Sequence, residues 1–118
     1  MEFGRGSEWT VGTHYRLAFT ARGNLELWKT PELSLVWESR TSGKGAKLIM
    51  QGDGNLVIYD DDGESVWASG TFGNERALLG VEDDGRLVIY SADLSQTLWD
   101  SASAEHEAEE AGADKAES

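Results

Sequence analysis

Every second residue between Gln51 and Tyr59 carries a side chain that can contact a ligand. The five residues are Gln51, Asp53, Asn55, Val57 and Tyr59. A carboxylate only accepts hydrogen bonds, whereas side-chain amides both donate and accept, so the set suits reversible binding of a polar ligand. Glycines and then aliphatic residues occupy the positions between them. Because alternate side chains of a strand point to opposite faces, this segment has a ligand face and a core face.

The same pattern occurs three times along the chain. Its glycines are 31 residues apart and so are the aromatic residues that end each copy, namely Gly23, Gly54 and Gly85, and Trp28, Tyr59 and Tyr90. A short Trp-containing segment follows each copy, at residues 35–39, 65–69 and 97–101. A repeat of this length indicates that one small structural unit is used three times.

Each unit is predicted to be β-structure. Apolar residues alternate with a period of two, while the glycine spacing and the β-branched residues disfavour a helix. A three-residue Gly-Asp-Gly turn is expected to pair Gln51 with Asn55 and to hold Gly54 in a left-handed conformation. Three antiparallel sheets, one per repeat, can then bury their apolar faces around a pseudo-threefold axis. The residues expected to fill the centre, as core rather than as ligand platforms, are Trp37, Trp67 and Trp99.

The length of 118 residues suits one domain with a tail. Residues 1–8 are expected to be an added expression leader without order, and residues 9–101 to form the β-domain. Its repeats are placed at about 13–42, 43–73 and 74–101. The acidic segment 102–118 lacks apolar periodicity and is expected to be disordered.

Composition excludes several functions. A net charge of −12 argues against nucleic-acid and anionic-lipid partners, and no apolar run is long enough for membrane insertion. There is no cysteine, no catalytic signature, and no acid pair that stands out, so we expect no enzyme. The run Asp60–Asp62 lacks calcium-loop spacing and is interpreted as a turn. His14 and His106 are isolated, so no metal site is expected.

The pattern Gln-x-Asp-x-Asn-x-Val-x-Tyr, in three units each followed by a Trp-containing strand, resembles the bulb-type mannose-binding lectins. Similar domains occur in bacteria, and the chain is expected to be a bacterial-type member of the family. The resemblance covers about residues 9–101, and the middle repeat matches at all five positions. It implies a β-prism II fold of three four-stranded antiparallel sheets. It also implies non-catalytic binding of α-linked mannose without metal or other cofactor.

The resemblance also implies a role for each residue of the middle motif. Asp53 and Asn55 would bind the axial 2-hydroxyl of mannose, and Gln51 the 3-hydroxyl. Tyr59 would bind the 4-hydroxyl, and Val57 would touch the apolar C3–C4 edge.

The other two repeats depart from the motif. The third repeat, a possible degenerate site, has Glu82, Asp84, Arg86, Val88 and Tyr90 at these positions. Arginine donates but cannot accept, and its bulk would fill the pocket. The first repeat has Thr20, Arg22, Asn24, Glu26 and Trp28, and keeps only the Asn. Both repeats are expected to serve as scaffold, with recognition of another glycan as the alternative.

The expected partners are therefore mannose-containing glycans, and the resemblance favours a secreted or cell-surface location. The resemblance also implies a dimer in which the subunits exchange a C-terminal strand. The short segment before the first repeat and the acidic tail argue against this exchange, so a monomer or weak homodimer is expected. The rival hypothesis is a β-prism scaffold that acts as a protein-interaction or bacteriocin-like module with weak or altered glycan specificity.

Overall fold

The computed structural model describes residues 2–102, which form eleven β-strands. Their bounds are β1 (Glu2–Gly4), β2 (Ser7–Val11), β3 (Tyr15–Phe19), β4 (Leu25–Lys29), β5 (Ser34–Glu38), β6 (Lys47–Met50), β7 (Leu56–Tyr59), β8 (Ser65–Ala68), β9 (Leu78–Val81), β10 (Leu87–Tyr90) and β11 (Thr97–Asp100). Of the predicted tail 102–118, residues 103–118 lie outside the described part of the chain.

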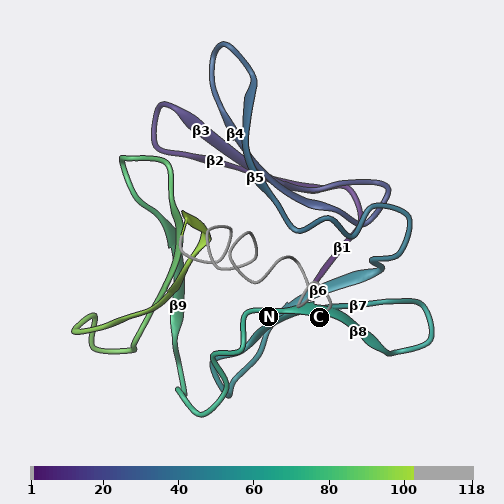
Figure 1. Ribbon diagram of the computed structural model, residues 1–118, viewed down its shortest axis with the longest axis vertical. Helices are drawn as coiled ribbons and strands as arrows, with labels where there is room; N and C mark the ends of the chain where they lie inside the picture. Colours follow the sequence, from purple (N-terminus) through teal and green to yellow (C-terminus); the bar gives the residue numbers. More distant parts are fainter. Residues whose placement is uncertain (1, 103–118) are drawn as a thin grey trace, which may run out of the picture.

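Three antiparallel sheets surround a common centre (Figure 1). Sheet I has the order β2-β3-β4-β5, sheet II the order β1-β6-β7-β8, and sheet III the order β11-β10-β9. Each sheet is built on one repeat. This confirms the predicted all-β class with three antiparallel sheets around a pseudo-threefold axis. The expectation of four strands in every sheet is wrong for sheet III, which has three within residues 2–102.

The turn that links β6 to β7 has the predicted form. Gln51 N–H donates to the carbonyl of Asn55 at 2.9 Å, and Gly54 N–H donates to the carbonyl of Gln51 at 3.0 Å. Gly54 has a φ of +93°, which a residue with a Cβ adopts only with strain. The carbonyl of Asn74 also lies where that Cβ would stand. Conformation and close packing together require glycine at this position.

The centre of the molecule is a triangle of tryptophans. The rings of Trp37, Trp67 and Trp99 contact one another pairwise, with every pair of centroids 5.6 Å apart and edge-to-face geometry. Each sheet adds aliphatic side chains around this triangle, with Leu27, Ile58 and Ile89 fully buried. Burial of one such side chain stabilises the fold by about 1.5–3 kcal/mol. The three faces therefore share one core.

Residues 2–8 contain β1 and the start of β2, whereas the sequence predicts an unordered leader over residues 1–8. β1 pairs with β6 in sheet II, and β2 pairs with β3 in sheet I. Phe3 and Trp9 pack edge to face with their ring centroids 4.8 Å apart, and both contact the core. Main-chain pairing with two repeats and this aromatic contact together order a segment that has no strong strand pattern of its own.

Candidate functional site

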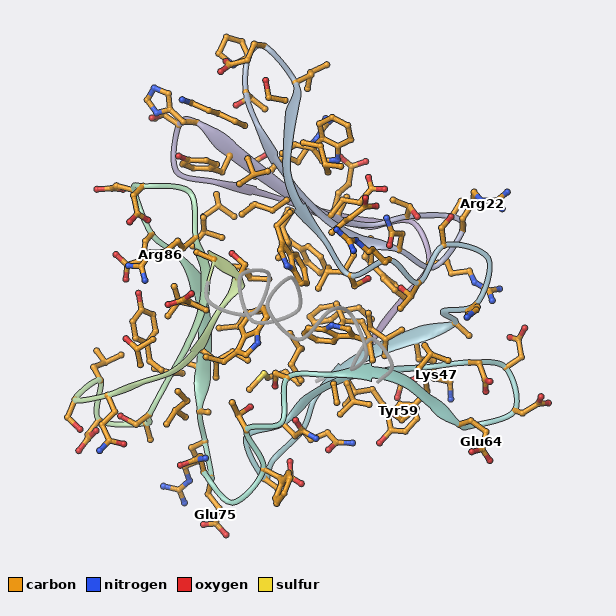
Figure 2. All side chains as sticks on the ribbon, viewed as in Figure 1. Arg22, Lys47, Tyr59, Glu64, Glu75 and Arg86 are labelled. Atoms are coloured by element: carbon orange, nitrogen blue, oxygen red, sulfur yellow. The ribbon has the colours of Figure 1, made fainter. Side chains whose placement is uncertain are left out.

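The middle repeat brings its five predicted site residues onto one hairpin. Gln51 and Asn55 lie opposite each other across the turn, and Tyr59 ends β7 on the outer side of sheet II (Figure 2). Gln51 Nε2 donates to the Tyr59 hydroxyl at 2.6 Å, which fixes both side chains. The amide oxygen of Gln51 and the phenolic proton of Tyr59 take no part in this bond.

Asn55 is held by three donors on its carbonyl oxygen. Oδ1 accepts hydrogen bonds from Ser69 Oγ at 3.2 Å, from Gly70 N–H at 2.9 Å and from Thr71 N–H at 3.1 Å. These bonds fix the amide so that Nδ2 faces the opposite way. Within residues 2–102 no protein acceptor receives a hydrogen bond from this Nδ2, so the donor is left open.

Asp53 lies exposed in the turn, and its loop is held from two sides. Its Oδ1 accepts the N–H of Asn55 at 3.0 Å. From the chain that leads to sheet III, Asn74 N–H donates to the carbonyl of Asp53 at 2.9 Å, and Arg76 N–H donates to the carbonyl of Gly52 at 3.3 Å. The carboxylate is thus presented on a positioned loop next to the Asn55 amide.

Val57 contributes less surface than the motif suggests. Only 3% of it is exposed, so any contact with a ligand is limited to that remnant. Its cross-strand partner in β8 is Ala68, whose side chain is a single methyl group.

The first repeat satisfies its own asparagine. Asn24 Nδ2 donates to Glu26 Oε2 at 2.9 Å and to Glu38 Oε1 at 2.8 Å. Glu26 also accepts the indole N–H of Trp28 at 2.9 Å. Thr20 Oγ1 accepts two backbone N–H groups of the turn, and Arg22 Nε donates to Ser42 Oγ at 3.0 Å. The amide donor that is open in Asn55 is occupied in Asn24.

The third repeat closes its site with an ion-pair network. Arg86 Nε contacts both oxygens of Asp84, at 3.1 and 3.0 Å, and Nη1 contacts Asp100 Oδ2 at 3.1 Å. The hydrogen bond to Asp84 is the main cause that raises the pKa of Arg86. Figure 2 shows Arg86 on the outer side of sheet III. Val88 is fully buried, while Glu82 and Tyr90 are half-buried.

One determinant of the site escaped the motif. The cross-strand partner of the motif's fourth position is Glu38 in sheet I, Ala68 in sheet II and Asp100 in sheet III. The two carboxylates occupy the donors of Asn24 and Arg86, whereas the alanine leaves Asn55 open. The signal is visible in the chain, because this residue directly follows each core tryptophan.

The remaining candidates have structural roles. Asp60 Oδ1 accepts the N–H groups of Asp62 and Glu64, both at 2.9 Å, as a turn residue does. His14 Nδ1 lies 2.7 Å from Thr13 Oγ1, and His106 lies outside the described residues. Residues 2–102 contain no group of three or more His, Cys, Asp or Glu side chains placed to hold a metal ion. The described part of the chain also has no helix that could span a membrane.

Comparison with known proteins gives a consistent result. No protein-family model matches the chain. Mannose-specific lectin 2 of Crocus vernus is 41% identical over 63 residues, which are 52% of this chain and 24% of that protein. The chain thus spans about a quarter of the length of this relative.

Solved structures match over most of the chain. The Polygonatum cyrtonema lectin, complexed with a monomannoside, has a TM-score of 0.67 and 33% identity over 77% of this chain and 84% of its own. The snowdrop (Galanthus nivalis) agglutinin, complexed with methyl-α-D-mannoside, has a TM-score of 0.66 and 28% identity with the same coverage. Both are β-prism II proteins, which confirms the predicted fold.

Proposed function

Because this chain belongs to the family of bulb-type mannose-specific lectins, we propose that it binds α-linked mannose through the middle repeat. The binding residues are Gln51, Asp53, Asn55, Val57 and Tyr59. Binding is reversible, non-catalytic and independent of metal. The first and third repeats serve as scaffold, and the protein acts as a monomer or weak homodimer. We also propose that the chain is a bacterial-type member of this family.

The chemistry of the site fits an axial hydroxyl. A sugar hydroxyl both donates and accepts, so it can donate to the Asp53 carboxylate while it accepts from Asn55 Nδ2. An ionised acceptor makes the stronger hydrogen bond. An equatorial 2-hydroxyl leaves this pair without its partner, and unmade hydrogen bonds are costly. Gln51 and Tyr59 then bind the 3- and 4-hydroxyls.

The observation that carries the proposal is the open donor of Asn55. The equivalent groups of the first and third repeats are occupied by Glu38 and Asp100, while Ala68 leaves this one to a ligand. One small site of this kind binds a monosaccharide with a Kd of about 1 mM.

The test is a titration followed by backbone amide resonances. Methyl α-mannoside should shift the resonances around Asp53, Asn55 and Tyr59, whereas methyl α-galactoside should not. The variant Asp53→Ala should lose the response, while the matched variant Asp84→Ala in the third repeat should keep it. Resonance dispersion checks that both variants fold, and EDTA should change nothing.

No response of the parent protein to tens of millimolar mannoside contradicts the proposal. That result favours the rival function, a prism scaffold that acts as a protein-interaction or bacteriocin-like module. A response that survives Asp53→Ala contradicts the assigned site.

A further inference from the structure

A hollow that the mannose motif does not use lies beyond the Tyr59 end of β7. It has a volume of about 360 Å³, within the range of about 300–1,000 Å³ that is common for small-molecule sites. Its lining includes Lys47, Ile49, Tyr59, Asp60, Asp61 and Asp62. Tyr59 belongs to both the motif and the hollow, so the two are adjacent on sheet II.

The lining has the composition of a saccharide subsite. Ile49 and the ring of Tyr59 offer apolar surface, Lys47 donates hydrogen bonds, and the carboxylates of the turn accept them. Lys47 pairs with Tyr59 across β6 and β7, and Figure 2 shows the two beside each other. The excess of carboxylates disfavours an anionic ligand. A metal ion is not favoured either, because no cluster of three metal-binding side chains exists among residues 2–102.

The turn that lines the hollow is held by hydrogen bonds within itself. Asp60 fixes the turn through two backbone N–H groups, and Arg5 Nη2 contacts Asp61 Oδ2 at 3.4 Å. Lys47 Nζ lies 3.8 Å from Glu2 Oε2 on the neighbouring strand. The two bonds to Asp60 order the turn before a ligand arrives, which lowers the cost of binding.

The orientation of the mannose proposed above determines which substituent reaches the hollow. The 2-hydroxyl lies at Asp53 and Asn55, and the 4-hydroxyl lies at Tyr59. C6 is attached to C5, next to C4, so a group carried on the 6-oxygen leaves the ring at the Tyr59 end. C1 lies opposite C4, and a residue attached there points away from the hollow.

We propose that this hollow is a subsite for a second neutral sugar residue, carried on the 6-oxygen of the mannose bound by Gln51–Tyr59. This inference rests on the proposed function and makes it narrower. The protein then recognises 6-substituted mannose within a chain, and not only terminal mannose.

The test compares three ligands by NMR titration or calorimetry. They are methyl α-mannoside, the methyl glycoside of α-1,6-mannobiose and the methyl glycoside of α-1,2-mannobiose. The 1,6-linked ligand should bind about five- to tenfold more tightly than the monosaccharide, as one or two added hydrogen bonds give. The 1,2-linked ligand should match the monosaccharide, because its second residue points away from the hollow.

Either residue of the 1,6-linked ligand can fill the primary site, so its affinity can exceed that of the monosaccharide twofold without any subsite. A gain in affinity of twofold or less therefore overturns the subsite. In that case methyl α-mannoside still binds and the proposed function stands. No binding of any of the three ligands removes both proposals together. The two failures are therefore distinguishable.

Two variants test whether the residues of the hollow cause the gain in affinity for the 1,6-linked ligand. In Lys47→Ala and Asp61→Asn the affinity for the 1,6-linked ligand should fall to that for the monosaccharide. The affinity for the monosaccharide itself should not change. The matched control is Arg16→Ala, at the equivalent position of the first repeat, where Arg16 pairs with Glu8 at 3.7 Å. It should keep the full gain. A gain that persists in both subsite variants contradicts the assignment.

Discussion

The middle and third repeats contain the same strand, Leu-Val-Ile-Tyr, as β7 and β10. The two strands have the same pattern of burial, with three buried residues and a half-buried tyrosine. Their surroundings differ. In the middle repeat Val57 faces Ala68 and Asn55 keeps an open donor, while in the third repeat Asp84 and Asp100 occupy Arg86. The strand thus encodes the fold, and the flanking polar residues decide whether a hairpin can bind.

The largest expected difference between the two repeats is in their turn glycines. Gly54→Ala should lower the free energy of unfolding by about 3–5 kcal/mol, because it combines left-handed strain with overlap on the backbone of Asn74. Gly85→Ala has the same strain, but its nearest neighbour is the Tyr15 hydroxyl at 3.1 Å, the end of a side chain that can move. Its cost should be about 1–2 kcal/mol. Urea unfolding of both variants measures the difference, and equal costs contradict this explanation.

The next comparison closes the middle site without touching its motif. Ala68→Glu should place a carboxylate against Asn55 Nδ2, as Glu38 does against Asn24 in the first repeat. Mannoside affinity should fall at least tenfold, about 1.4 kcal/mol, with little loss of stability. Ala68→Ser is the control and should bind like the parent protein. Titration with methyl α-mannoside decides, and unchanged affinity of Ala68→Glu excludes the open donor as the determinant.

The reverse change should open the third site. The triple variant Glu82→Gln, Arg86→Asn and Asp100→Ala restores the amides of the motif and removes the facing carboxylate. Methyl α-mannoside should then shift resonances around Asp84 and Tyr90 as well as those of the middle repeat. If only the middle repeat responds, the third repeat lacks something beyond these three side chains.

The repeat and the turn could be predicted because they depend on local order. The period of two and the Gly-Asp-Gly sequence lie within short stretches of chain, and the 31-residue spacing is visible when the sequence is compared with itself. The occupied sites were missed, because the residue after each core tryptophan meets the motif only once the strands pair, as Glu38 of β5 does with β4. That pairing shifts its register between Leu27 and Trp28, so sequence spacing alone does not align the two residues. β1 was missed for a related reason, because its partner β6 lies far along the chain and supplies most of its order.

The smallest expected effect concerns the β10–β11 turn, which sets sheet III apart from sheet II. In this turn Asp93 accepts hydrogen bonds from the Ser95 hydroxyl at 2.7 Å, the Ser95 N–H at 3.0 Å and the Ser91 hydroxyl at 2.8 Å. These bonds, those from Ser95 first, lower the pKa of Asp93 from 3.8 to about 2. A lowered pKa means that the ionised form stabilises the fold above pH 3.8 and that this contribution is lost as the pH falls towards 2. Ser95→Ala should move the pKa of Asp93 back towards 3.8, with Ser65→Ala in β8 of sheet II as a control that leaves it unchanged. Carboxyl-carbon NMR shifts between pH 1.5 and 6 measure both, and a pKa of Asp93 near 3.8 in the parent protein contradicts the role given to these three bonds.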